Sequence, residues 1–226
     1  HLIFVVKIKN NMRVCIIGSG LSALTLAKAL TKENIYVDIF SKTKKQKISP
    51  SRTIGISKSN FDYLNKNLIN IENISWQIKK IEIFTDNLKN EKILKFDNDN
   101  QLFSVIKNNK FYENLNKNLS NNKFFRKKFF TNKKIDLSKY NLVINTDYLS
   151  YLTRKYFNKK ILKIYNSKAY ITTFKHKKIH NDVAVQIFTK KGPLAFLPIS
   201  NNKTSVVYSI HNSITNTKEN VNELIK

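Results

Sequence analysis

The sequence predicts an α/β fold, in which a Rossmann-like three-layer nucleotide-binding domain is interleaved with a smaller β-rich domain. A glycine-rich turn at residues 18–20 lies between an apolar strand and an amphipathic helix. Segments with the strand–helix–strand pattern of a parallel sheet occupy residues 12–68 and 100–158. They alternate with strand-rich segments at residues 69–99 and 159–226. One domain that is interrupted by the other produces this order.

The nucleotide-binding part begins with a short apolar strand at residues 13–17, which we expect to be buried on both faces because it lacks alternation. A helix follows Gly20, since leucines and alanines recur along it at helical spacing. A second strand is predicted at residues 35–40. The later apolar run at residues 142–146 is expected to be another buried strand.

The remaining elements follow from the same two periodicities. Helices are predicted around Phe61 and from Phe111 to Leu119, and the last apolar residues, 221–225, suggest the start of a further helix. Further strands are predicted at residues 78–85, 92–96 and 103–106 and in the long runs that begin at Ile161. The first two, 78–85 and 92–96, are expected to form a hairpin in a different sheet.

The chain is strongly basic, with 41 Lys and Arg against 15 Asp and Glu and a formal net charge of +26. Such a charge suits nucleic acid or an anionic membrane surface. However, only four of the 41 basic residues are arginine, which nucleic-acid readers prefer for its bidentate contacts. Lysine, asparagine and isoleucine are also what A/T-rich codons encode. We therefore predict no specific nucleic-acid partner. A basic face on a peripheral membrane enzyme, and a non-catalytic basic protein that binds anionic lipid or nucleic acid, remain alternatives.

The single cysteine, Cys15, leaves no disulfide framework or cysteine metal site and fits a reducing cytoplasm. His176 and His180 follow a predicted strand and lack convincing ligand spacing, so no metal is predicted. No apolar run approaches the ~20 residues that a membrane span requires. We predict a cytoplasmic protein, with peripheral association at the inner face of the membrane as an option. Residues 1–11 lack a signal-peptide pattern and are interpreted as translated upstream sequence before a start at Met12.

Residues 18–23, Gly-Ser-Gly-Leu-Ser-Ala, match the dinucleotide fingerprint in its G-x-G-x-x-A form. Gly18 permits the tight turn, Gly20 lets the backbone approach a diphosphate, and Ala23 lets helix and strand pack closely. The diphosphate is expected at the helix N-terminus, where free N–H groups and the helix dipole favour an anion. The predicted cofactor-binding residues here are Gly18, Ser19, Gly20, Leu21, Ser22 and Ala23.

The acidic residue that usually binds a ribose hydroxyl at the end of the second strand is missing. Ser41 occupies that position, and its hydroxyl can make one hydrogen bond to a ribose but not the bidentate contact of a carboxylate. Asp38, three residues earlier, is expected in the middle of the strand and is a poor substitute. This replacement predicts weak cofactor binding.

The fingerprint, together with the run SRTIGIS at residues 51–57, resembles the opening of the FAD-dependent aromatic hydroxylases related to p-hydroxybenzoate hydroxylase. The resemblance implies that Arg52 lies against the flavin. The run LVINTD, residues 142–147, is similar to the second FAD motif of this family, and Asp147 is its aspartate. The motif is degenerate, because Tyr148 stands where the family has a glycine.

The segment FTKKGPLAFLPIS, residues 188–200, closely resembles the G-P-x-A-x-L-P segment of the ubiquinone-biosynthesis hydroxylases, which act on polyprenylated phenols. The alternative is a generic hairpin with its turn at Gly192 and Pro193. The resemblance also implies a third FAD motif beyond Lys226, so that the chain is C-terminally truncated. The residues that it places on the substrate side are Gly192, Pro193, Leu194 and Pro198.

What the resemblance implies is a flavin-dependent monooxygenase that uses FAD, NAD(P)H and O₂ to hydroxylate a phenolic ring, such as a ubiquinone precursor. The cofactor supplies the chemistry and the protein supplies its position, and no catalytic residue is assigned. Activity of this length of chain alone is doubtful without the third motif. Another FAD-dependent oxidoreductase of the same fold, a dehydrogenase or an isoprenoid reductase, remains an alternative.

Overall fold

The computed structural model describes residues 12–43, 48–86, 91–130, 135–156, 161 and 163–211. The chain divides into two compact units, and each is described by itself. The first unit consists of His1–Ile48, Asn67–Ile69 and Asn109–Lys160, and the second of Ser49–Lys66, Asn70–Asn108 and Ile161–Lys226.

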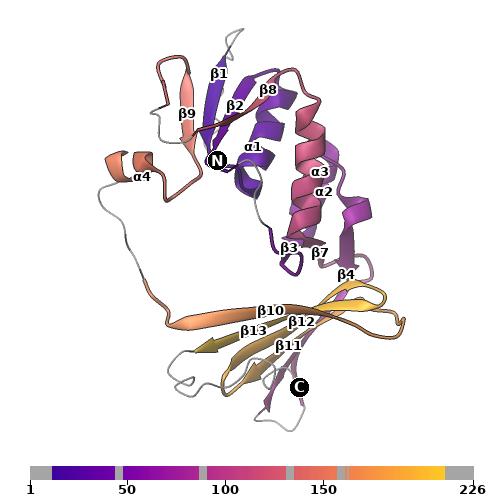
Figure 1. Cartoon of the computed structure of the whole chain (residues 1–226). Coiled ribbons are helices and arrows are strands. Elements are labelled where there is room, and N and C mark those ends of the chain that lie inside the picture. The colour runs from indigo at the N-terminus through magenta and orange to yellow at the C-terminus, as the bar shows by residue number, and fades with distance from the viewer. Residues whose placement is uncertain are drawn as a thin grey trace. The chain divides into compact units, whose positions relative to one another are not determined.

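The first unit contains a four-stranded parallel sheet in the order β8-β2-β1-β9 (Figure 1). β1 (Arg13–Ile17) has a partner on each edge, and its residues after Arg13 are buried. β2 (Tyr36–Ser41) and β9 (Leu142–Asn145) flank it, and β8 (Phe125–Phe129) pairs with the outer edge of β2. The prediction of a buried strand is confirmed for β1 but was wrong for residues 142–146, because β9 is at the end of the four-stranded order and none of its residues is buried.

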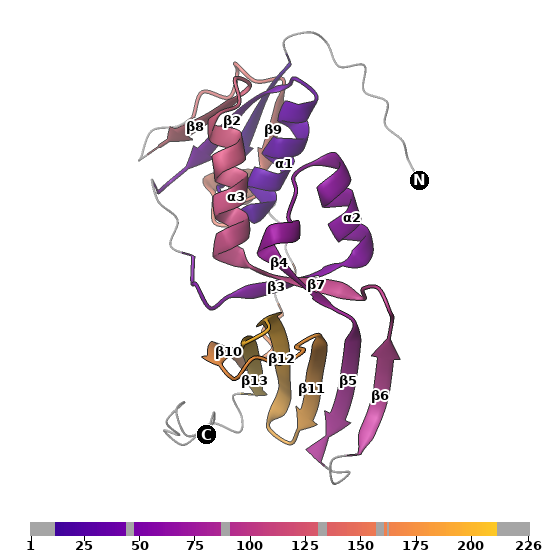
Figure 2. The ribbon, with the colours of Figure 1, turned by 90° about the vertical axis from the view of Figure 1, so that its right-hand side faces the viewer.

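Both faces of this sheet are covered. α1 (Leu21–Lys32) packs on β1 and β2, and α3 (Asn108–Ser120) lies beside α1 (Figures 1 and 2). α3 buries Phe111, Leu115 and Leu119, which confirms its predicted apolar face. A second cluster joins Cys15 and Ile17 to Leu152 of the short helix α4 (Tyr151–Tyr156). Because both faces of the sheet are covered, the loops that follow the strands meet at the edge formed by the strands' carboxyl ends.

The second unit is built mainly of antiparallel sheet. A six-stranded sheet has the order β10-β13-β12-β11-β5-β6, and a three-stranded sheet has the order β3-β7-β4 (Figure 2). The two sheets share a core formed by Ile78, Val105 and Ala184. The pairing of β5 with β6 confirms the predicted hairpin. The elements are β3 (Thr53–Ser57), α2 (Lys58–Asn67), a 3-10 turn (Glu72–Ile74), β4 (Ser75–Ile78), β5 (Lys80–Thr85), β6 (Lys92–Asp97), β7 (Phe103–Lys107), β10 (Ser167–Lys175), β11 (Val183–Thr189), β12 (Gly192–Ser200) and β13 (Lys203–His211).

Several details differ from the sequence-based expectation. β3 and β8 were not predicted, because Gly55 interrupts the first and three consecutive basic residues occupy the second. The β11–β12 turn lies at Lys190–Lys191, so that Gly192 and Pro193 already belong to β12. Residues 49–66 and 100–108, assigned from the sequence to the nucleotide-binding part, group with the second unit. The helix expected at 221–225 lies outside the described residues.

Candidate functional site

A cleft of about 300 Å³ lies in the first unit, where the chain leaves the carboxyl ends of β1, β2 and β9. In open α/β sheets this edge is the usual ligand-binding position, because the loops that follow parallel strands meet there. Three loops and the residue after β8 contribute to the cleft wall. The lining residues are Gly18, Ser19, Gly20, Phe40, Ser41, Lys42, Thr43, Phe130, Thr146, Asp147 and Tyr148.

Gly18 is required by the fold itself. Its φ is +115°, a conformation that side chains rarely adopt, and an added Cβ would collide with Oγ1 of Thr146. Its N–H donates to the Phe40 carbonyl at 2.9 Å, while Thr146 donates from its backbone N–H to the Ile17 carbonyl at 2.8 Å. The turn after β1 is therefore tied to both neighbouring strands, and Gly18 allows this close approach.

Gly20 is different, because nothing described in the chain requires a glycine there. Its φ is −75°, and no described atom lies within 4 Å of the position that a Cβ would occupy. It is the N-cap of α1, and neither a capping side chain nor an acidic residue is described in the first helical turn. The N–H groups of that turn are consequently available to an anion in the cleft. A Cβ would project into space that a ligand could occupy.

Ser41, predicted to replace the ribose-binding carboxylate, is used inside the loop. It is 3% exposed, and its Oγ lies 2.9 Å from the Ser19 hydroxyl. It donates to the Thr43 carbonyl at 2.8 Å and accepts from the Thr43 N–H at 3.3 Å. A hydroxyl has one proton to donate and two lone pairs, so these three contacts occupy it fully. Ser41 thus fixes the loop after β2 against the fingerprint turn.

Asp147 lies in the cleft, where it faces a cation that the sequence analysis did not identify. Its Oδ2 is 3.7 Å from Nζ of Lys42, and the two side chains are 27% and 53% exposed. Its Oδ1 accepts the Leu149 N–H at 3.0 Å, and its own N–H donates to Oδ1 of Asn145 at 3.2 Å. The carboxylate is therefore held at the edge of the cleft by the start of the following turn.

The structure brings together only part of the predicted binding set. Gly18, Ser19, Gly20, Ser41 and Asp147 all line the cleft. The remaining fingerprint residues do not line the cleft. Leu21 and Ser22 begin α1, and Ala23 is a buried residue of the same helix. The lining residues that sequence reasoning missed are Phe40, Lys42, Thr43, Phe130, Thr146 and Tyr148.

Most of the missed residues are neighbours of predicted ones, so they follow once the ends of adjacent strands are placed at one edge of the sheet. Lys42 and Thr43 continue from Ser41, and Thr146 precedes Asp147. Phe130 carried no such signal, because it follows β8, a strand that the sequence did not predict.

The other predicted residues belong to the second unit. Arg52 precedes β3, and its carbonyl accepts the N–H of Asn108 at 2.9 Å. Gly192 has a φ of +139°, and an added Cβ would collide with the Ser209 carbonyl, so its glycine has a structural cause. Pro193, Leu194 and Pro198 lie along β12, between β11 and β13. Their assignment to a substrate side stays a prediction.

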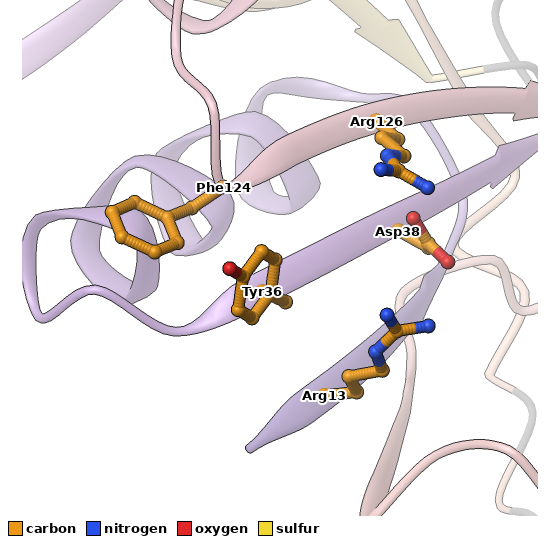
Figure 3. Close-up of a pocket in the computed structure, with 5 residues that line it drawn as sticks. All are labelled: Arg13, Tyr36, Asp38, Phe124 and Arg126. Atoms are coloured by element: carbon orange, nitrogen blue, oxygen red, sulfur yellow. The ribbon is translucent and has the colours of Figure 1, made fainter. Parts of the chain in front are cut away.

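Figure 3 shows the residues around a second hollow in the first unit, whose volume is too small for a ligand. Its volume is about 10 Å³, which is room for roughly one water molecule. Asp38 accepts hydrogen bonds from Nζ of Lys128 and from the Tyr140 hydroxyl, both at 2.6 Å. The aspartate therefore has a structural role, and its predicted position in the middle of the strand is confirmed. The residues that line the hollow are Arg13, Tyr36, Asp38, Phe124 and Arg126.

In the described part of the chain, no three His, Cys, Asp or Glu side chains are grouped as a metal site would require. None of the helices in the described ranges is both long and apolar enough to cross a membrane.

The sequence matches no family model and no curated protein. Its fold, in contrast, is similar to that of many solved structures. One is PqsL from Pseudomonas aeruginosa, described as a probable FAD-dependent monooxygenase, with a TM-score of 0.69 and 12% identity over 91% of this chain and 62% of that one. Another is 2,6-dihydroxypyridine-3-hydroxylase from Arthrobacter nicotinovorans, with a TM-score of 0.68 and 16% identity over 89% of this chain and 57% of that one.

A third is HpxO from Klebsiella pneumoniae in complex with FAD, with a TM-score of 0.72 and 10% identity over 95% of this chain and 61% of that one. At such low identities the similarity establishes the fold, and the predicted α/β class is confirmed. The chain spans about three fifths of the length of these structures.

Proposed function

We propose that this chain binds FAD and belongs to a flavin-dependent monooxygenase that hydroxylates an aromatic ring. The observation that carries the proposal is the cleft after β1, where Gly20 caps a helix beside space that nothing described in the chain fills. A dinucleotide diphosphate needs this combination of a bare backbone and unpaired N–H groups. The fold shared with PqsL, described as a probable FAD-dependent monooxygenase, and with HpxO, solved in complex with FAD, supports the choice of FAD as the dinucleotide.

The residues present fit FAD in part. Gly20 and the N-terminus of α1 would hold the diphosphate, because Gly20 lines the cleft and the helix dipole favours an anion there. Gly18 would shape the turn, since its own N–H is already bonded to the Phe40 carbonyl. No carboxylate at the end of β2 would clasp the ribose, since Ser41 stands there and its hydroxyl is occupied within the loop. We therefore expect FAD to bind weakly to the chain as given.

When bound, FAD would accept a hydride from NAD(P)H and activate O₂ for transfer of an oxygen atom to the ring. The role of this chain's residues is to bind and orient the cofactor. Asp147 is the one carboxylate among the described lining residues, and it is held by the Leu149 N–H rather than aimed freely at the cleft. No acid–base residue is assigned.

The finer parts of the proposal come from the sequence. The similarity of residues 188–200 to the ubiquinone-biosynthesis hydroxylases supports a phenolic, prenylated ubiquinone precursor as substrate. The net charge of +26 supports contact with an anionic membrane surface, where such a substrate would reside. Arg52 would contact the flavin, and Gly192, Pro193, Leu194 and Pro198 would face the substrate. A dehydrogenase or isoprenoid reductase on the same fold is the second candidate.

The central test is FAD binding by the wild-type chain and by Gly20→Val, followed by quenching of flavin fluorescence. A branched side chain would occupy the place of the diphosphate, so we expect an affinity about tenfold lower or worse, with an unchanged circular dichroism spectrum. Gly55→Ala is the matched control, because Gly55 lies in β3 and an added Cβ makes only ordinary contact with Phe103. Undiminished FAD binding by Gly20→Val would refute the proposed site.

The reaction class needs a separate measurement. Consumption of NADH or NADPH in the presence of a phenol should depend on O₂ and yield a product that gains one oxygen atom, detected by mass spectrometry. Reduction or dehydrogenation of the substrate without incorporation of oxygen would favour the second candidate.

A further inference from the structure

The cleft contains one feature that the fingerprint does not explain, an ion pair across its mouth. Lys42 follows β2 and Asp147 follows β9, and these strands lie on opposite sides of β1. Their side chains meet at 3.7 Å, so the pair connects the two walls on either side of the turn after β1. Among the described residues that line the cleft, these two are the charged ones. Both lie in the first unit, so the pair does not depend on the second.

An anionic ligand in the cleft would change the electrostatic balance of the pair between Lys42 and Asp147. A diphosphate at the N-terminus of α1 would bring about two negative charges close to the Asp147 carboxylate, and like charges at this range repel. Lys42 is the described cation in the cleft that can offset this repulsion. An ammonium group is also a strong partner for phosphate oxygens.

The geometry allows Lys42 to change partner. The Nζ–Oδ2 distance of 3.7 Å exceeds the ~2.7–2.9 Å of a strong charge-assisted hydrogen bond, and the lysine side chain is 53% exposed. The backbone beside it is fixed, because Ser41 is hydrogen bonded to Ser19 and Thr43. Asp147 keeps its contact with the Leu149 N–H when the lysine leaves. The ammonium group of Lys42 can thus move, while the backbone beside Lys42 and the carboxylate of Asp147 stay in place.

We propose that Lys42 is the diphosphate-binding cation of this cleft, and that it is held by Asp147 in the free protein and transferred to the diphosphate when the dinucleotide binds. This inference rests on the proposed function, because it assumes a dinucleotide in the cleft. It makes Lys42 a direct ligand contact and Asp147 a competitor for the same ammonium group.

The test compares Lys42→Met, Asp147→Asn and the double variant, with ADP, FAD and riboflavin as probes in calorimetric and fluorescence titrations. We expect Lys42→Met to weaken ADP and FAD about tenfold and to leave riboflavin, which has no phosphate, unchanged. It should also reduce the dependence of ADP affinity on salt. Asp147→Asn should strengthen ADP binding several-fold, and the double variant should bind no better than Lys42→Met.

A matched control is Lys110→Met, which removes the same charge from an exposed pair with Glu113 outside the cleft. Exposed ion pairs contribute little to stability, so neither lysine variant should change the unfolding midpoint. The inference is overturned if Lys42→Met binds ADP like the wild type. It is equally overturned if Asp147→Asn restores Lys42→Met to wild-type affinity, because the lysine would then only neutralise the carboxylate.

Failure of the proposed function has a different outcome. FAD binding that Gly20→Val abolishes and Lys42→Met leaves intact refutes the inference alone. ADP binding that depends on Lys42, in a protein that reduces or dehydrogenates its substrate without incorporation of oxygen, refutes the function alone. A wild-type chain that binds neither ADP nor FAD refutes both.

Discussion

Cys15 lies at the centre of the first unit and reports on its integrity. The pKa of its thiol is raised from 9.0 to about 12, chiefly because burial disfavours the thiolate; the negative charge of Asp38 also raises this pKa, and the positive charge of Lys128 lowers it. The thiolate is the reactive form of cysteine, so the native thiol should be inert at ordinary pH.

The same shift predicts how the stability of this unit depends on pH. The folded state holds the thiol proton more tightly than the unfolded state, so this contribution is fully present below about pH 9 and is lost as pH rises toward about 12. Titration with a thiol reagent at pH 8 should label the native protein far more slowly than the unfolded one. Urea unfolding should show a loss of stability above pH 9 that Cys15→Ala reduces. Rapid native labelling at pH 8 would contradict the buried position.

At the scale of single elements, β12 depends on a glycine at its first residue. Gly192 adopts a φ of +139°, and an added Cβ would collide with the Ser209 carbonyl of the neighbouring strand. A backbone group cannot turn aside as a flexible side chain can. Gly192→Ala should therefore destabilise the six-stranded sheet by at least about 1–3 kcal/mol, the range for strained backbone conformations.

This prediction has its control in the same unit. Gly55 lies inside β3 without a positive φ, and an added Cβ would meet the Phe103 ring at 3.4 Å. Gly55→Ala should leave stability unchanged or raise it slightly, because alanine loses less backbone freedom on folding. Thermal unfolding of both variants tests the pair. Equal unfolding midpoints for Gly192→Ala and Gly55→Ala would mean that folding does not need a glycine at position 192. That result would strengthen the assignment of Gly192 to the substrate side.

β8 shows why local sequence pattern is insufficient for an edge strand. Arg126, Lys127 and Lys128 follow one another, and three consecutive basic residues are typical of a solvated loop. In the folded chain Lys128 donates to Asp38 of β2 and to the Tyr140 hydroxyl, at 2.6 and 3.3 Å. These partners are far away in the sequence, so the stabilisation of the strand is absent from any local window.

For the whole molecule, the charge of +26 predicts binding to polyanions without selectivity. Retention on immobilised DNA should weaken steeply with salt, because the contacts release counterions, and no sequence should be preferred. Competition between random duplexes and selected sites measures this directly. A site favoured roughly a thousandfold over random DNA would reach the range of specific binders and contradict the interpretation of the charge as codon bias.

Within the first unit, β1, the turn after it and α1 were predictable because their information is local. The apolar run of β1, the glycine turn and the helical spacing of α1 are adjacent in sequence, and they define both the fold class and the centre of the cleft. What could not be predicted depends on distant partners. The hydroxyl of Ser41 was expected to face a ribose, but Ser19 and Thr43 occupy it. Lys42 carried no signal in the sequence, because its partner Asp147 follows a different strand and lies more than a hundred residues away.

The contrast between Gly18 and Gly20 has a consequence for the evolution of this chain. The first glycine is needed by the fold, because it adopts a φ of +115° and Thr146 lies against it. The second faces open space in the cleft, so only a ligand there would require it. If the cleft binds a dinucleotide as proposed, a lineage that lost this ligand would accumulate alanine or serine at position 20 while position 18 stayed glycine. A fingerprint eroded at its second glycine alone would therefore identify a descendant that has kept the fold and lost the ligand.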